Sequence, residues 1–209
     1  MGVISHPRYM IRFTLLLCLS ILPSFSLWAN PRCLKLEPAI REATERYIAK
    51  DYPVHYNVAT AEKETSCQWR DSLDGHGSVG YFQLTPKFLD PLLKPLFPDY
   101  TKPYSKDHFY AFAYFLSTLI KSNPAPHLWI VYQRYNGGNW VIQECRRAGS
   151  WEWERCLQNC KRGQVCVWKV GAECKRYRSA CEVNYEYSLL IYSYADKYRR
   201  GGDGRWRYW

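Results

Sequence analysis

Cysteine is the residue type that most limits how this chain can fold. The 209-residue sequence contains nine cysteines, and only Cys18 lies in the apolar N-terminal stretch, which leaves an even set of eight. In an oxidising compartment such a set forms a disulfide framework, although the sequence does not fix which cysteines pair. A zinc site is the alternative, but there is no C-x-x-C, and the spacings of 3, 5, 7 and 6 residues between Cys156 and Cys181 fit no common ligand pattern. The sequence therefore predicts up to four disulfides.

The first 29 residues have the composition of a secretory signal peptide. Arg8 and Arg12 precede an apolar run at residues 13–29, a pattern typical of a cleaved leader. A membrane anchor is the competing interpretation, but Pro23 interrupts the run, which is shorter than the roughly 20 residues that a span needs. We therefore predict cleavage near Ala29 and export to the periplasm or the exterior, with no stable membrane insertion of the mature chain.

The positive net charge of the chain indicates which kinds of polymer it would attract. Removal of Arg8 and Arg12 with the leader lowers the formal charge from +10 to +8. A basic exported protein meets phosphate-rich or carboxylate-rich envelope polymers before nucleic acid, and the attraction is long-ranged and sensitive to salt. We therefore expect no nucleic-acid partner, although the charge could serve solubility alone. The mature chain of roughly 180 residues suits one domain.

Apolar periodicity predicts a mainly helical fold. Helical stripes cover residues 36–49, 54–66 and 105–122, the last with Ser105 or Asp107 as its N-cap. Further elements are expected as a short helix after Pro86, a helix over 127–149 broken at Gly137 and Gly138, a strand at 163–170 and a tyrosine-rich helix over 184–200.

Three short motifs follow one another along the chain. They are "ETS" at residues 64–66, "GSVGYFQLTP" at 77–86 and "RYNGGNW" at 134–140. Together they resemble the soluble lytic transglycosylase family of lysozyme-like enzymes, whose pattern is Glu with Ser or Thr, then G-A-x-G-L-M-Q-x-x-P, then Y-N-A-G or Y-N-G-G. The resemblance covers roughly residues 54–140. Ser78 replaces the common alanine, Tyr81 and Phe82 replace Leu and Met, and the region after Cys145 has no counterpart.

The resemblance also implies a division of the chain. Residues 30–144 are expected to form a lysozyme-like helical core, and residues 145–200 a small disulfide-rich extension packed on it. That extension could brace the fold, dock a partner or act as a lid. Residues 201–209, rich in glycine, arginine and tryptophan, are expected to form a flexible tail.

The implied reaction is cleavage of the β-1,4 bond between N-acetylmuramic acid and N-acetylglucosamine in peptidoglycan. The glycosidic oxygen is a poor leaving group, so a general acid must protonate it. Hydrolases generally add a second carboxylate. In a transglycosylase the muramic acid 6-hydroxyl attacks instead, and the same carboxyl group, now deprotonated, accepts its proton. One glutamate and no cofactor or metal then suffice, and the product carries a 1,6-anhydro end.

Glu64 is the predicted acid and base, because Thr65 follows it and Gln83 lies 19 residues further on. Glu62 is the alternative, and since the two side chains should point about 200° apart on a helix, only one can face a given cleft. Phe82 and Leu84 are expected in the core. The resemblance implies five substrate-binding residues: Ser78, Tyr81, Gln83, Tyr135 and Asn136.

Other residue types receive weaker predictions. Trp140, Trp151 and Trp153 follow the Tyr-Asn-Gly-Gly turn at 135–138 and are candidates for stacking on sugar rings. The histidines show no metal-ligand spacing and are assigned no role.

Two alternatives remain open at this stage. A hydrolytic muramidase of the same fold would need a second carboxylate such as Asp71, Asp74 or Asp90. A non-catalytic peptidoglycan-binding assembly protein would use the cleft to bind glycan strands without cleaving them. It would bind an envelope or secretion-complex partner through its basic, aromatic C-terminal section.

Overall fold

The computed structural model describes residues 29–71 and 77–209. The predicted signal peptide, apart from Ala29, lies outside the described residues, and so does Asp74. Within the described part the fold is mainly helical, as predicted, and none of its helices is long and apolar enough to cross a membrane. Its elements are α1 Pro31–Tyr47, α2 His55–Thr65, α3 Pro86–Leu93, α4 Lys106–Lys121, α5 Leu128–Gly137, α6 Trp140–Ala148, α7 Trp153–Gln158, β1 Gln164–Val170, β2 Glu173–Ser179, α8 Ala180–Ala195 and the 3-10 turn η1 Asp196–Tyr198.

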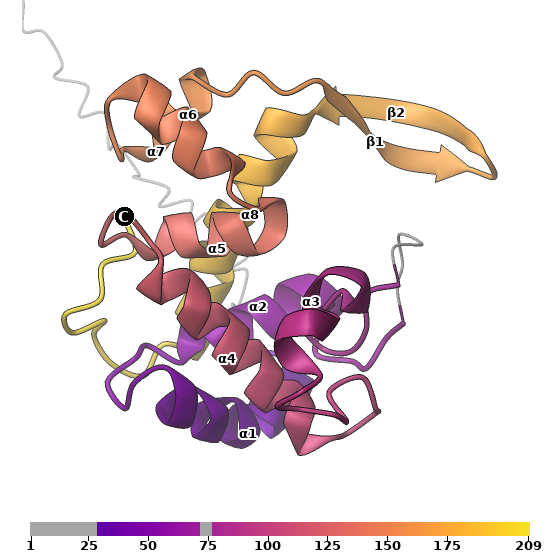
Figure 1. Cartoon of the computed structure of the whole chain (residues 1–209), viewed down its shortest axis with the longest axis vertical. Coiled ribbons are helices and arrows are strands. Elements are labelled where there is room, and N and C mark those ends of the chain that lie inside the picture. The colour runs from indigo at the N-terminus through magenta and orange to yellow at the C-terminus, as the bar shows by residue number, and fades with distance from the viewer. Residues whose placement is uncertain (1–28, 72–76) are drawn as a thin grey trace, which may run out of the picture.

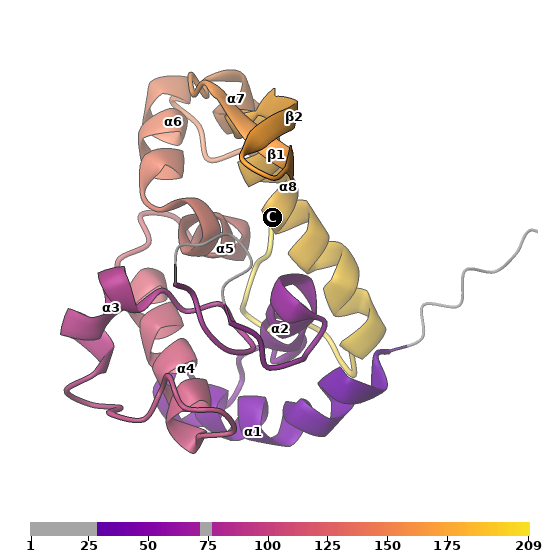
Figure 2. The same ribbon diagram turned by 90° about the vertical axis from the view of Figure 1, so that its right-hand side faces the viewer.

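The helices form a body with a smaller upper part (Figure 1). In the body, α2 packs against both α1 and α8, while α4 packs against α1 and α5. Above α5, α6 and α7 pack on each other, and the antiparallel hairpin of β1 and β2 extends from the same end of the molecule. Figure 2 shows α2 flanked by α1 and α8.

Local signals set several helix ends where the sequence predicts them. The second helix ends at Thr65, and α4 begins after Ser105, whose hydroxyl accepts a hydrogen bond from the Asp107 amide at 3.1 Å. The predicted break at Gly137 and Gly138 separates α5 from α6. The predicted strand at 163–170 is present as β1.

The first helix begins earlier than predicted. It starts at Pro31 rather than near Leu36, because the Asn30 side chain accepts a hydrogen bond from the Arg32 amide at 3.0 Å and proline is tolerated in a first turn. The added turn contains Cys33, which is buried.

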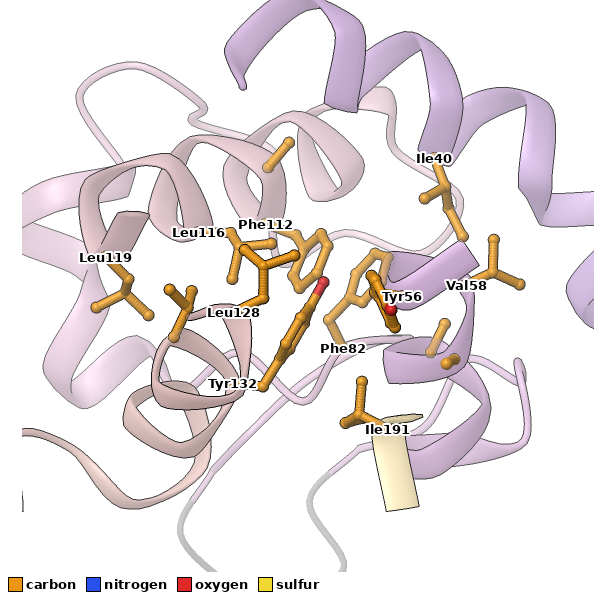
Figure 3. Close-up of a cluster of buried hydrophobic side chains, with 14 of the residues drawn as sticks. Ile40, Tyr56, Val58, Phe82, Phe112, Leu116, Leu119, Leu128, Tyr132 and Ile191 are labelled. Atoms are coloured by element: carbon orange, nitrogen blue, oxygen red, sulfur yellow. The ribbon is translucent and has the colours of Figure 1, made fainter. Parts of the chain in front are cut away.

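An aromatic core lies between α2, α4 and α5. Phe82 and Leu84 are buried, as predicted, and the Phe82 ring stacks on Phe112 with ring centroids 3.7 Å apart. Figure 3 shows these rings in one cluster with Tyr132 of α5 and Ile191 of α8. The second motif is therefore anchored in the core by its apolar members.

Four disulfides close the fold. Cys33–Cys67 joins the first turn of α1 to the end of α2. The other three are Cys145–Cys156, Cys160–Cys181 and Cys166–Cys174. All eight predicted cysteines are therefore paired, and a chain with four disulfides is suited to an oxidising compartment, which indicates an exported protein.

The last long helix belongs to the body rather than to an extension. The sequence predicts residues 145–200 as a unit packed on the core, but α8 packs against α2 and α5, and both Tyr187 and Ile191 are buried in the core. Among the described elements, only α6, α7 and the hairpin extend beyond the body (Figures 1 and 2).

The chain end is not the flexible tail that its composition suggests. The amide of Leu128 donates to the Arg207 carbonyl at 2.7 Å, and that of Trp129 donates to the Tyr208 carbonyl at 2.9 Å. The Tyr208 side chain is buried, and its hydroxyl donates to the Ser188 carbonyl at 2.5 Å. The prediction is wrong because glycine content describes local freedom only, whereas burial of one aromatic ring fixes a chain end through distant contacts.

Candidate active site

Glu64 lies in the last turn of α2, half-buried against α8. The Tyr187 hydroxyl of α8 donates a hydrogen bond to its Oε1 at 2.6 Å. Burial first, and then the charge of Glu64, raises the pKa of Tyr187 well above its usual value, so this phenol keeps its proton and remains a donor. The carboxylate is therefore oriented by a residue to which sequence analysis assigned no role in the site.

The neighbouring Glu62 serves a different contact. Its carboxylate binds Lys197 Nζ at 3.1 Å and accepts a hydrogen bond from the Tyr198 hydroxyl at 2.7 Å. These partners belong to η1, so Glu62 ties the end of α8 to α2. Of the two glutamates, Glu62 is engaged in a structural ion pair, and Glu64 is the candidate for chemistry.

The second motif forms a tight turn beside the end of α2. Val79 and Leu84 pair through two backbone hydrogen bonds of 2.8 and 3.0 Å, and the Gly80 amide donates to the Arg70 carbonyl at 2.8 Å. Gly80 and Gln83 both have left-handed backbone conformations, with φ of 76° and 50°. The turn therefore reverses the chain within a few residues.

Hydrogen bonds join the three motifs to one another. The Thr65 hydroxyl of the first motif donates to the Tyr81 carbonyl of the second at 3.0 Å. The Tyr135 hydroxyl of the third donates to the Phe82 carbonyl at 2.5 Å. Burial, and to a smaller degree the charge of Glu64, holds the pKa of Tyr135 well above its usual value. Segments that are distant in the sequence thus meet around Glu64.

A groove of about 450 Å³ opens beside this meeting point. Its volume lies within the range of roughly 300–1,000 Å³ found for ligand sites. The groove is amphipathic, since its lining combines amide and hydroxyl groups with apolar side chains of α3 and α4. Four of the predicted site residues line it, namely Ser78, Gln83, Tyr135 and Asn136, together with Leu84, Thr85, Phe88, Leu89, Phe115, Arg134 and Gly138.

The polar groups of the groove are already partly engaged by the protein. Gln83 Nε2 donates to the carbonyls of Arg70 and Gly80, at 3.2 and 3.0 Å, so a ligand contact from Gln83 would use its amide oxygen. The Ser78 hydroxyl lies 2.8 Å from that of Thr85. These bonds fix the positions of the side chains before any ligand binds, which lowers the entropic cost of binding.

Tyr81 does not line the groove, contrary to its predicted role. Its side chain is only 5% exposed and stacks on Phe109 with centroids 5.5 Å apart, while Trp69 meets it edge-on. The correction has a simple cause, because the backbone turn at 80–83 directs Tyr81 and Phe82 into the core. We therefore remove Tyr81 from the candidate site.

The three candidate tryptophans lie elsewhere. Trp140 is exposed at the start of α6 and is absent from the described lining of the groove. Trp151 and Trp153 line a separate cavity together with Trp209. None of the three belongs to the groove beside Glu64.

No carboxylate is among the described residues that line the groove, and Glu64 itself lies next to the lining residue Tyr135, whose pKa its charge affects. Asp90 accepts a hydrogen bond from Tyr100 at 2.5 Å, at the edge of a different cavity, and Asp71 is exposed in a backbone bridge with Val79. Among the described residues, no cluster of three or more His, Cys, Asp or Glu side chains is placed to hold a metal ion.

The apolar side of the groove was missed by sequence analysis. Phe88 and Phe115 lie on α3 and α4, outside the three motifs, and helical periodicity does not distinguish a groove wall from a core face.

Comparison of the chain with family models, with curated proteins and with solved structures found no match.

Proposed function

We propose that the protein is a lytic transglycosylase that cleaves the β-1,4 bond between N-acetylmuramic acid and N-acetylglucosamine in peptidoglycan. One observation carries the proposal: three motifs far apart in the sequence are joined by hydrogen bonds around a single glutamate beside a groove. A mainly helical body with this glutamate at a helix end also supports assignment to the lysozyme-like fold.

In the proposed mechanism Glu64 acts twice. It first gives a proton to the glycosidic oxygen as the bond breaks, since that oxygen is otherwise a poor leaving group. The resulting carboxylate then accepts the proton of the muramic acid 6-hydroxyl, which attacks the anomeric carbon of its own sugar. The new C–O bond closes the 1,6-anhydro ring, and the proton balance of Glu64 is restored. Internal attack is favoured because the hydroxyl is already close to the reacting carbon.

The surroundings of Glu64 fit a double role. Tyr187 donates to the carboxylate and orients it at the end of α2. Tyr135 supports the turn through Phe82 and also lines the groove. Gln83 and Asn136 can then bind acetamido or hydroxyl groups, while Phe88 and Phe115 offer aromatic faces to the sugar rings.

The groove favours a transglycosylase over a hydrolytic muramidase. A hydrolase generally needs a second carboxylate to activate water or to form the covalent intermediate. The described lining of the groove adds no acidic residue to Glu64, which lies beside it near Tyr135, and internal attack needs only that one carboxyl group.

Analysis of the products tests the proposal directly. Purified peptidoglycan incubated with the mature protein should release fragments that end in 1,6-anhydro-muramic acid, because the nucleophile belongs to the substrate. Mass spectrometry distinguishes these ends from reducing ends, which are heavier by one water. Reducing ends would identify a hydrolase instead, and binding without cleavage would favour the non-catalytic wall-binding alternative.

Substitution of Tyr187 by phenylalanine should lower the rate of cleavage about tenfold to a hundredfold, since a hydrogen bond to a charged group contributes roughly that much. The rate of fragment release from purified peptidoglycan measures the loss.

Tyr198→Phe is the matched control for this experiment. It removes the same kind of hydrogen bond from Glu62, at 2.7 Å, and should leave the rate unchanged. Equal effects of the two substitutions would mean that Tyr187 contributes to stability only.

A further inference from the structure

The hairpin of β1 and β2 extends away from the helical body (Figure 1). In the perpendicular view it is seen nearly end-on, which confirms that its long axis points outward (Figure 2). β2 continues directly into α8 at the base of the hairpin, and the Cys166–Cys174 disulfide links the two strands further out. An isolated two-stranded ribbon is marginal in water, so the disulfide accounts for its persistence.

The hairpin exposes apolar side chains to an unusual degree. Its large exposed members are Val165 (37%), Val167 (40%), Val170 (53%), Trp168 (60%) and Tyr177 (59%). Single exposed apolar residues are ordinary on a protein surface, but five on one ribbon of 16 residues form an apolar patch that covers both of its faces, since Val165 lies opposite Arg178 and Tyr177 lies opposite the adjacent Cys166. Such patches generally mark a surface that binds another surface.

Positive charge is interleaved with these side chains. Trp168 lies directly opposite Arg176, and Val165 lies opposite Arg178, so each apolar residue shares a face with an arginine. Arg178 is paired with Glu186 at 2.9 Å. Arg176 and the exposed Lys161 next to the hairpin form no ion pair with any described residue, and their charge is available to a partner.

We propose that this hairpin docks the protein on the surface of an anionic lipid bilayer. Tryptophan and tyrosine are favoured at the boundary between headgroups and acyl chains, and valine gains free energy when it leaves water. Arginine and lysine are attracted to anionic headgroups. The outward direction of the ribbon lets it reach a flat surface ahead of the body (Figure 1). The contact is peripheral, which differs from a membrane span.

The composition of the patch favours lipid over the other occupants. A glycan strand presents hydroxyl and acetamido groups, which would leave the exposed valines without an apolar partner. A second copy joined through the same patch would bring Arg176 close to its own counterpart, because a two-fold interface places each surface against itself. An anionic bilayer offers acyl chains to the valines and negatively charged headgroups to Arg176.

Sedimentation with lipid vesicles tests the proposal on the full mature protein. Vesicles of phosphatidylcholine mixed with phosphatidylglycerol should bind it, vesicles of phosphatidylcholine alone should bind far less, and added salt should weaken the binding. The double substitution Val167→Thr with Trp168→Thr keeps a β-branched residue at 167 and should weaken binding about tenfold or more. Arg176→Gln should weaken it severalfold and should reduce its dependence on salt.

Two control variants match these changes outside the hairpin. Trp140→Thr removes a tryptophan of similar exposure, 57%, from α6, and Arg146→Gln removes an exposed arginine from the same helix. Both should bind vesicles as the parent does. Trp168→Phe should also bind, but it should lose most of the fluorescence quenching that brominated acyl chains cause in the parent.

Several outcomes would overturn the proposal. One is failure of the parent to bind anionic vesicles, and another is a loss of affinity in the controls as large as that in the hairpin variants. Hairpin-dependent binding to purified peptidoglycan without lipid would assign the patch to the wall, and hairpin-dependent dimerisation in size-exclusion chromatography would assign it to a second copy. Because none of these measurements requires catalysis, the result is independent of the proposed activity.

Discussion

Glu64→Gln should lower peptidoglycan cleavage by at least about 10³-fold, because general acid–base catalysis contributes up to roughly 10⁴-fold and this residue serves both proton transfers. Glutamine has nearly the same shape and can still accept the Tyr187 hydrogen bond through its amide oxygen. It cannot release a proton to the glycosidic oxygen or accept one from the 6-hydroxyl. Release of soluble fragments from purified peptidoglycan measures the loss.

Glu62→Gln provides a control from the same helix. It changes the same functional group two residues away, but the carboxylate that it removes binds Lys197 and Tyr198 rather than the groove. The variant should cleave at the parental rate and lose only a modest amount of stability, since a partly buried ion pair is weakened. If Glu64→Gln cleaves as fast as the parent, Glu64 is not the acid; if Glu62→Gln is the slow variant, the assignment of the two glutamates is reversed.

Binding and catalysis can be separated in the same variant. Because Gln83, Asn136 and the aromatic wall of the groove are unchanged, Glu64→Gln should still bind glycan strands. A variant that binds but does not cleave indicates a chemical role for Glu64. Loss of binding together with cleavage would instead indicate damage to the fold.

Sequence reasoning succeeded where the determining residues are close together in the chain. The end of α2 at Thr65, the Ser105 cap of α4 and the break before α6 all depend on neighbours within a few positions. Such signals act through local backbone geometry and side-chain caps, so they can be recognised without knowledge of distant contacts. Disulfide formation was also predictable from an even set of cysteines, although the pairing was not.

The candidate site depends on contacts that no local pattern contains. Tyr187 lies 123 residues from Glu64, and the sequence offers 18 tyrosines without marking which one reaches it. Its identity follows only from the way α8 packs along α2. The prediction that Tyr81 lines the groove failed for a local reason. The positive φ at Gln83 belongs to a tight turn, and in that turn side chains do not alternate regularly between the core and the groove.

The C-terminal segment shows how distant packing overrides composition. Tyr208 is buried against Tyr56, with centroids 4.6 Å apart, and Tyr56 in turn donates to Asp203 at 2.6 Å. A segment with several glycines thus supplies part of the body that holds α2. Because α2 carries Glu64, the geometry of the site depends on residues at the far end of the chain.

Gly80→Ala should destabilise the protein by about 2 to 5 kcal/mol, the largest effect we expect from adding one methyl group. Alanine at a φ of 76° costs roughly 1–2 kcal/mol. Its Cβ would also lie 2.2 Å from His108 Cε1, and overpacking a core costs about 1–3 kcal/mol or more. The His108 ring cannot yield easily, because it is fully buried, stacks against Phe82 and donates through Nδ1 to the Tyr100 carbonyl at 2.8 Å.

Gly77→Ala separates the two causes of this loss. Gly77 has the same φ of 76°, but a Cβ there would meet no described atom within 4 Å, so the variant should lose only about 1–2 kcal/mol. Urea unfolding with the disulfides intact measures both values, and the difference between them isolates the contact with His108. His108→Ala should abolish that difference, because the small side chain leaves room for the added methyl group. Equal losses from the two glycine substitutions would show that Gly80 is required for its backbone conformation alone. The close packing of the second motif on His108 would then contribute nothing to the free energy of unfolding.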